Sequence, residues 1–406
     1  MINREPATIC FPFTGDAIGG SHISVLGLIR NLDRSRYRPL ILPQRPDGAV
    51  AALFREHRIE IEQSFHWTEP PFDMRIDART VLSVLGDIRP QIRFLRSKNV
   101  AIVHSNDGRT HATWALPARL AGAKLLWHHR GNPGARGLRF AAPLLANEVV
   151  AVSRFALPRP GLFSAASKAE VVHSPFDISV HEDRTAARTA LLNELRAPAD
   201  SIFIGYFGTF VERKRPELFI ESIAALIARQ PGRPIYGLMF GAALDNRTQS
   251  ALEKKVQMLK LGEHVRFMGW RTPGVRWIAA CDMLMVPAID EPFGRTLIEA
   301  MLVGTPIVAT RSGGNIEALR DGDIGQLVQP ESASALAAAC QRYCDSPAFA
   351  KSMADRARTD ACGRFGEDAH ARQIMAIYDR MLSRNPASAV EHRQLTRGGA
   401  TNGRAG

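Results

Sequence analysis

The sequence predicts an α/β protein with two doubly wound parallel sheets, on the strength of two observations. Short runs rich in Val, Ile and Leu recur along the chain, each followed by a stretch of helical periodicity, the pattern of parallel strands joined by crossover helices. The chain has 406 residues, about twice the usual length of one domain, and its 45% hydrophobic and 23% charged residues are ordinary for a soluble protein. No apolar run approaches the roughly 20 residues that a membrane-spanning helix needs.

Each half of the chain carries six strand candidates. They are 8–11, 39–42, 101–104, 124–128, 148–152 and 170–173 in the first half, and 202–207, 235–240, 265–269, 283–286, 306–309 and 325–328 in the second. In open parallel sheets, ligands bind outside the carboxyl ends of the strands. Two such domains facing each other are therefore expected to form a cleft.

The domain boundary is expected near residue 180, because Ser174-Pro175-Phe176 interrupts regular structure and a charged, helix-like stretch follows. The first domain is expected over 1–180 and the second over 181–365. A helical pattern predicts a further helix at 366–384, which we expect to cross back to the first domain. Residues 385–406 contain too few apolar side chains to pack, and we expect a disordered basic tail.

Positive charge is concentrated in the first half of the chain. Residues 1–180 hold 23 Lys and Arg against 15 Asp and Glu, whereas residues 181–382 hold 25 against 24. This excess favours an anionic partner, such as a phosphorylated substrate, a membrane surface or nucleic acid, although general solubility explains it equally well. No nucleic-acid-binding module accompanies the charge, so nucleic acid is not an expected partner.

The five cysteines form no CxxC pair and no Cys/His metal spacing. Neither a disulfide framework nor a zinc site is expected from such spacing. The first residues lead into an apolar run without a leader-like segment. We therefore expect a cytosolic protein.

The most specific segment is EPFGRTLIEAM at 291–301, followed by GTPIVAT and GGNIE. Glu291 follows a strand, and Gly294 allows a tight turn into a helix whose free N–H groups attract phosphate. Glu299 lies inside this helix among apolar residues, so a buried carboxylate there needs a hydrogen-bonding partner. A ribose diol is such a partner.

Other polar loops follow predicted strands. Gly208 leads through a glycine turn to three adjacent cations at 213–215, and Gly19-Gly20 precedes an amphipathic helix. Glycine at a helix start permits close approach of the backbone to a phosphate or an acceptor. Two strands end in histidines, at His104 and at 128–129, and only one of the adjacent pair is expected to face the cleft.

These motifs, in this order, resemble the retaining nucleotide-sugar glycosyltransferases of glycosyltransferase family 4, which have the GT-B fold of two Rossmann-like domains. The resemblance extends from the Gly19-Gly20 loop to the last helix and is densest over 202–330. It implies transfer of a sugar from a nucleoside diphosphate sugar, with retention at the anomeric carbon and without a metal or other cofactor. The implied acceptor is a glycan or lipid-linked molecule of polysaccharide or lipopolysaccharide biosynthesis.

The resemblance also implies roles for individual residues. Glu299 would hold the nucleotide ribose, Glu291 would lie beside the donor sugar, and Lys214 would neutralise the diphosphate. Thr209 stands where the family often has arginine, so that contact is either missing or supplied by Arg213 or another residue. The other implied donor contacts are His128 at the sugar, Trp270 or Arg271 at the base, and Phe293, Gly294, Arg295, Thr296, Gly208, Gly19 and Gly20 around the sugar and diphosphate. The acceptor contacts are assigned to His22, Asn106, Asp107 and His129.

No protein general base is assigned, because a phosphate oxygen of the donor is the usual base in such enzymes. The alternatives are a GT-B nucleotide-sugar epimerase or phosphorylase, and a non-catalytic sugar-nucleotide-binding protein. The basic first domain also predicts peripheral contact with the cytoplasmic face of a membrane.

Overall fold

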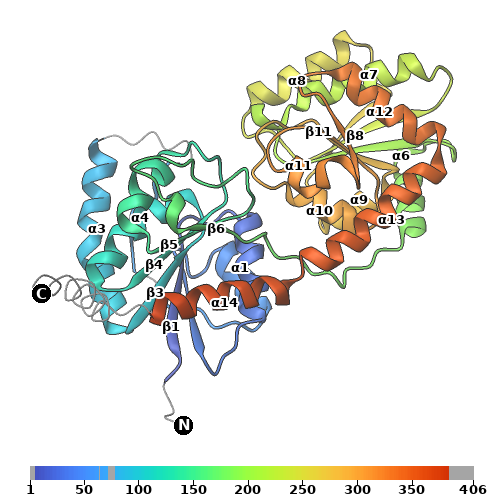
Figure 1. Cartoon of the computed structure of the whole chain (residues 1–406). Coiled ribbons are helices and arrows are strands. Elements are labelled where there is room, and N and C mark those ends of the chain that lie inside the picture. The colour runs from blue at the N-terminus through green and yellow to red at the C-terminus, as the bar shows by residue number, and fades with distance from the viewer. Residues whose placement is uncertain (1–4, 64, 72–77, 384–406) are drawn as a thin grey trace, which may run out of the picture.

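The computed structural model describes residues 5–63, 65–71 and 78–383. It contains two six-stranded parallel sheets, one from each half of the chain (Figure 1). This confirms the predicted α/β architecture. The basic tail predicted at 385–406 lies outside the described residues.

The first sheet has the strand order β2-β1-β3-β4-β5-β6, and every neighbouring pair is parallel. Each strand agrees with its predicted run to within two residues at either end. The strands are β1 (Ala7–Phe13), β2 (Tyr37–Pro43), β3 (Val100–Ser105), β4 (Lys124–His129), β5 (Glu148–Ala151) and β6 (Ala169–Val171).

Helices cover both faces of the first sheet. Successive strand residues point to opposite faces, so Ile9 and Phe11 pack with one set of helices and Cys10 with the other. The first set is α1 (Gly20–Arg30), α2 (Ala49–Glu56) and α14 (Glu367–Ser383). The second set is α3 (Ala78–Ser97), α4 (Gly108–Ala121), the π-helical turn η1 (Gly137–Ala141) and α5 (Ala142–Leu145), and a short η2 (Ala166–Lys168) precedes β6.

The second sheet has the order β12-β11-β10-β7-β8-β9, again all parallel. The strand order reverses between β7 and β10, which makes this the switch point of the sheet. The strands are β7 (Ile202–Phe207), β8 (Ile235–Phe240), β9 (Val265–Gly269), β10 (Met283–Val286), β11 (Ile307–Thr310) and β12 (Gln326–Val328).

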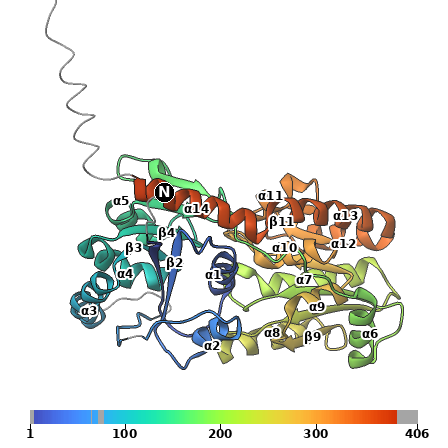
Figure 2. The ribbon, with the colours of Figure 1, turned by 90° about the horizontal axis from the view of Figure 1, so that it is seen from below.

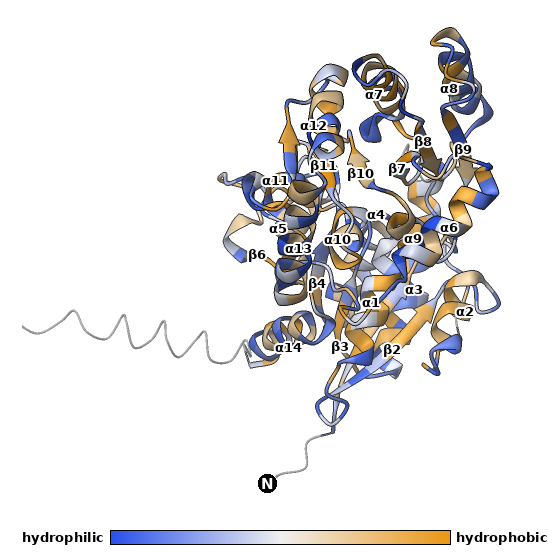
Figure 3. Cartoon of the chain, turned by 90° about the vertical axis from the view of Figure 1, so that its right-hand side faces the viewer, coloured by the Kyte–Doolittle hydropathy of each residue, from blue (hydrophilic) through white to orange (hydrophobic). Residues whose placement is uncertain are grey.

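The second sheet is also covered on both faces, and Figure 3 shows its apolar strands enclosed by helices of mixed polarity. Ile204 and Tyr206 pack on the side of α7 (Pro216–Arg229), α8 (Asn246–Met258) and α12 (Ala333–Asp345). The opposite side holds α6 (Arg184–Leu195), α9 (Gly274–Ala280), α10 (Arg295–Leu302) and α13 (Pro347–Arg364). Short helices η3 (Glu212–Lys214), α11 (Asn315–Ala318) and η4 (Arg320–Gly322) lie in the loops.

Helix α14 returns to the first domain and lies beside α1 (Figures 1 and 2). Its residues Ile374 and Tyr378 are completely buried in the core formed with β1 and α1. The Tyr378 hydroxyl lies 2.6 Å from Nδ1 of His104, at the end of β3. A helix that follows the second domain in the chain therefore completes the core of the first domain.

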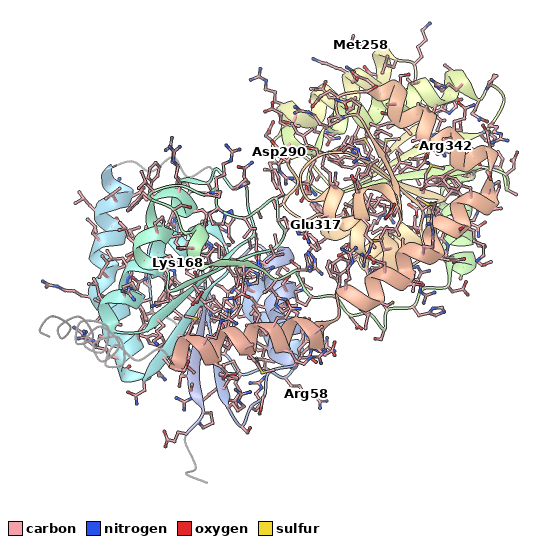
Figure 4. The ribbon with its side chains drawn as sticks, viewed as in Figure 1. Arg58, Lys168, Met258, Asp290, Glu317 and Arg342 are labelled. Atoms are coloured by element: carbon pink, nitrogen blue, oxygen red, sulfur yellow. The ribbon has the colours of Figure 1, made fainter. Side chains whose placement is uncertain are left out.

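The two domains meet through loops that follow the carboxyl ends of strands. Nε2 of His173 lies 2.8 Å from Oε1 of Glu317, whose Oε2 accepts a 2.6 Å hydrogen bond from the backbone N–H of Arg154. The Ser153 hydroxyl donates to the carbonyl of Pro292. Figure 4 shows Glu317 and Asp290 on the side of the second domain that is turned toward the first.

Candidate active site

A small pocket lies at the switch point of the second sheet. Crevices at such points are the usual ligand sites of doubly wound sheets. Four predicted site residues line it, which are Lys214, Glu291, Gly294 and Thr296. The other lining residues come from the ends of β7 and β10 and the turn after β10, and are Tyr206, Phe207, Met285, Val286, Pro287 and Ala288.

The glycine turn after β7 brings Lys214 back against the strand end. Gly208 has a φ of +131°, in the region that favours glycine, and a Cβ there would collide with Nζ of Lys214. Among the described residues, no carboxylate lies within ion-pair distance of Nζ. Thr209 follows Gly208 and is partly buried. The pocket therefore holds a cation without a protein counter-charge, suited to an anionic ligand.

Glu291 is fixed from both sides. A Cβ at Gly313 would lie 2.6 Å from the backbone oxygen of Glu291, and the N–H of Gly314 donates to that oxygen at 2.7 Å. The side chain of Glu291 is 14% exposed and forms an ion pair with Arg213. Because Gly313 and Gly314 have no side chains, the loop that contains them can pack against the acidic loop at Glu291. Arg213 pairs with the carboxylate of Glu291 here. That Arg213 supplies the diphosphate contact of the arginine missing at Thr209 stays a prediction.

The helix after the acidic loop begins beside the pocket. Gly294 has a φ of +57° and forms the N-cap of α10, so the first N–H groups of the helix start where Gly294 and Thr296 line the pocket. Phe293 is buried and stacks on His173 with ring centroids 5.0 Å apart. The carboxylate of Glu299, 24% exposed, lies 3.7 Å from Nε of Arg295.

Arg295 reaches from the second domain into the first. Its NH1 donates to the Ser24 hydroxyl and to the Pro175 carbonyl, each at 3.2 Å, and its guanidinium stacks 4.2 Å from the ring centre of Phe176. A Cβ at Gly20 would lie 2.5 Å from Cδ of Arg295. Gly20 of the first domain therefore allows close approach of a side chain from the second, a contact that the sequence did not predict.

The predicted acceptor residues of the first domain lie near its own switch point, between β1 and β3. His22, at the start of α1, accepts a 3.1 Å hydrogen bond at Nδ1 from the N–H of Gly19, and burial lowers its pKa. Asp107 caps α4 by accepting from the N–H and the hydroxyl of Thr110. Asp107 therefore caps the helix, and its contact with an acceptor stays a prediction.

His128 and His129 do not face an open surface. His129 is 5% exposed, with Nε2 3.0 Å from the carbonyl of Asn132. His128 is fully buried, with Nδ1 3.1 Å from Nε2 of His104 and its ring stacked toward His370 of α14. We call His104, His128 and His370 the histidine cluster. This location gives no support to the predicted contact of His128 with the donor sugar, because α14 covers the ring.

Arg130 directly follows β4, and its side chain contacts residues from two other loops of the first domain. The sequence analysis did not single out this residue. Its NH1 donates to the Ser174 hydroxyl at 3.0 Å and its NH2 to Oδ1 of Asn106 at 3.2 Å. A charged residue directly after two histidines was the available signal. Pattern reasoning assigned the strand end to His128, whereas the strand extends one residue further.

Trp270 and Arg271 follow the edge strand β9 and do not line the pocket. Trp270 is 66% exposed, whereas Arg271 pairs with Glu194 at 2.6 Å and stacks on Trp277. Their contact with the nucleotide base stays a prediction. In the part of the chain that the structure describes, no group of three or more His, Cys, Asp and Glu side chains is arranged to hold a metal ion.

Comparison with solved structures places the fold in a class. HepE of Anabaena, solved with UDP and glucose, superposes with a TM-score of 0.76 at 23% identity, over 92% of this chain and all of HepE. Sucrose-phosphate synthase from Thermosynechococcus elongatus superposes with a TM-score of 0.71 at 20% identity, over 93% of this chain and all of that one. The architecture is therefore the GT-B fold, as the sequence predicted.

Sequence relatives then define the family. The model of the group 1 glycosyl transferases matches residues 187–360. A D-inositol 3-phosphate glycosyltransferase of Nocardioides is 31% identical over 94% of this chain and 89% of its own length. The lipopolysaccharide core biosynthesis glycosyltransferase LpsE of Rhizobium meliloti is 31% identical over 48% of this chain, and the match spans about half of LpsE, 53%. The chain belongs to the group 1 glycosyltransferases.

Proposed function

We propose that the chain transfers a sugar, with retention of anomeric configuration, from a nucleoside diphosphate sugar to a glycan or lipid-linked acceptor. The observation that carries this proposal is the pocket at the β7/β10 switch point, which combines Lys214, Glu291 and the start of α10. HepE was solved with UDP and with UDP-glucose, which supports a nucleotide-sugar donor for this fold.

In this proposal, the chemical problem is negative charge on the departing diphosphate. Lys214 and the N–H groups at the start of α10 supply positive charge where that negative charge develops. Glu291, held by Arg213, lies beside the donor sugar, and Glu299 binds the ribose. The acceptor hydroxyl attacks from the leaving-group face and gives its proton to a phosphate oxygen, so no side chain acts as general base and no metal or cofactor takes part.

A transfer assay tests this function. The chain is incubated with labelled UDP- and GDP-sugars and an extract of lipid-linked glycans, in buffer with and without EDTA. We expect a labelled glycan whose new linkage keeps the donor's anomeric configuration by NMR, with equal yield in EDTA. A free epimer or a sugar phosphate instead would identify an epimerase or a phosphorylase, and nucleotide binding without any product would identify a non-catalytic binding protein.

The acceptor belongs, in our proposal, to polysaccharide or lipopolysaccharide assembly at the cytoplasmic face of a membrane. The names of two relatives from Rhizobium meliloti, both lipopolysaccharide core glycosyltransferases, support this assignment. No helix in the described ranges combines the length and apolarity needed to cross a bilayer. Contact with the membrane would therefore be peripheral.

One surface of the first domain suits such contact. Helices α3, α4, η1 and α5 pack beside one another, and some of their apolar side chains are exposed. Leu82 is 69% exposed, Leu144 65% and Phe140 56%, and exposed arginines such as Arg89 and Arg139 accompany them. Exposed apolar side chains interleaved with cations favour an anionic lipid surface.

Sedimentation with phosphatidylglycerol vesicles at low salt tests this surface. The double variant Leu82→Ser with Leu85→Ser should bind less, because it removes two exposed apolar side chains of α3. The control is Leu244→Ser, which changes an equally exposed leucine of the second domain, 66% exposed. Absence of vesicle binding by the unmodified chain would contradict membrane association.

A further inference from the structure

Arg130 is a partly buried cation whose hydrogen-bond partners are all neutral. It follows β4, and it donates to the Ser174 hydroxyl and to Oδ1 of Asn106, with His128 3.4 Å from NH2. Its Nε is buried and has no hydrogen-bond partner among the described residues. Nor does any described carboxylate lie within ion-pair distance of the guanidinium. A partly buried guanidinium without a counter-charge is unfavourable, and such arrangements are typical of binding sites.

The surroundings of Arg130 are also positive. Burial and the nearby charge of Arg295 lower the pKa of Arg130 to about 9, and only the carboxylate of Asp107 opposes this. Asp107 is already engaged in capping α4. Arg130 therefore remains protonated at neutral pH without a neutralising partner, and Arg295, the cation that lowers its pKa, comes from the other domain.

Additional hydrogen-bond donors lie on the same edge of the first sheet. Since Nδ1 of His22 accepts from the N–H of Gly19, the neutral ring carries its proton on Nε2. Nε2 has no hydrogen-bond partner among the described residues, and the residue is 6% exposed. The N–H groups at the start of α1, beginning at Gly20, lie beside it. Asn106, His22 and Arg130 come from the ends of three elements that meet near the β1/β3 switch point.

We propose that Arg130, together with His22 and the start of α1, binds an oxyanion, a phosphate or a carboxylate, carried by the sugar or acceptor part of a substrate. This deepens the proposed glycosyltransferase function and rests on it. Lys214 lines the pocket of the second domain, and Arg130 is not among its lining residues. Arg295, the first residue of α10, lies next to Gly294 and Thr296, which line that pocket, and its charge acts on Arg130.

Such a site binds an anionic substrate more tightly than a neutral substrate of the same shape. One pair of probes, glucose 6-phosphate and glucose, represents an acceptor-borne anion and is titrated calorimetrically with and without saturating UDP. The other pair, UDP-glucuronate and UDP-glucose, represents a donor-borne anion. We expect the unmodified protein to bind the anionic member of one pair about tenfold or more tightly, the value of a charge-assisted hydrogen bond. The pair that shows the preference identifies the source.

The variant R130Q should abolish that preference and leave UDP binding within about twofold. The control R136Q removes an exposed arginine six residues further on, with the same change of charge, and should keep the preference. Equal binding within both pairs by the unmodified protein, or an unchanged preference in R130Q, would overturn the proposal. So would a loss in R130Q of UDP affinity relative to uridine, because Arg130 would then belong to the diphosphate site.

Two measurements keep this test decisive. If circular dichroism shows that R130Q does not fold, R130K replaces it, and the preference should fall severalfold because an ammonium cannot form the bidentate contact. An unchanged preference in R130K would overturn the proposal. Failure of the unmodified protein to bind any nucleotide would count against the proposed glycosyl transfer, whereas the glucose 6-phosphate pair, run without nucleotide, still decides the role of Arg130.

Discussion

Replacing Lys214 with alanine should weaken binding of nucleoside diphosphates far more than binding of nucleosides. Nζ of Lys214 lies against Gly208, lines the pocket and has no described carboxylate partner, so its charge is available to a diphosphate. Two unit charges 4 Å apart at an effective dielectric constant of about 20 attract by about 4 kcal/mol, an upper bound before desolvation. Hydrogen bonds to charged groups contribute about 1.5–3 kcal/mol in practice, which predicts a loss of about 10- to 150-fold in UDP affinity.

Calorimetric titration of UDP, UMP and uridine measures this difference directly. The matched control is Lys254→Ala, which removes an exposed lysine from α8 in the same domain. We expect the control to bind like the unmodified protein, and Lys214→Ala to retain its uridine affinity. An equal loss for uridine and UDP, or no loss for either, would refute the assignment of Lys214 to the diphosphate.

Three further predictions concern other parts of the structure. Glu299→Ala should cost about 1.5–3 kcal/mol of nucleoside binding, measured by titration with uridine or guanosine, and an unchanged affinity would remove Glu299 from the site. Burial lowers the pKa of each member of the histidine cluster, that of His370 to about 3, so these side chains are neutral when folded. As pH falls below about 6.5, where unfolded histidine gains its proton, each should remove about 1.4 kcal/mol of stability per pH unit, and urea melts at pH 7.5 and 5.5 should show this loss. Gly241→Ala should unfold at a lower temperature than the unmodified chain, because Gly241 has a φ of +137° and a Cβ there would collide with the carbonyl oxygen of Gly208; an unchanged melting temperature would contradict the tight contact between these two turns.

The fold was predictable because its signals are local. Each strand of the described residues coincides with a short apolar run that predicts it, and the second-half strands agree to within one residue. The ends were less certain where a polar residue closes a strand, as at His129. Parallel pairing followed from the alternation with helices.

Four predicted site residues line one pocket because they follow strands that are adjacent at a switch point, and the role of this pocket as a donor site stays a prediction. Lys214 and Glu291 are far apart in sequence, but each comes after the carboxyl end of a central strand, β7 or β10. The position of Arg213 against Glu291 was not predictable, since it depends on the side-chain path within the loop.

Contacts between the domains could not be predicted from sequence patterns. Arg295 meets Ser24 and Phe176 only because the two domains are docked, and no periodicity records the docking geometry. The burial of His128 likewise depends on α14, which packs there from the far end of the described chain. Arg130 was missed for the same reason. Whether a carboxylate lies near it depends on how loops distant in sequence come together at the edge of the first sheet.

The most direct test of the account is a thermal-shift series with UDP, GDP, ADP, dTDP and CMP, on the unmodified chain and on Glu299→Ala. A nucleotide present at about 100 times its dissociation constant adds about 2.7 kcal/mol, which is about 5–10 °C in melting temperature for a domain of this size. The account predicts that one nucleotide raises the melting temperature of the unmodified chain and leaves that of the variant nearly unchanged. No shift with any nucleotide, or an equal shift in both proteins, would contradict a nucleotide-sugar site at the start of α10.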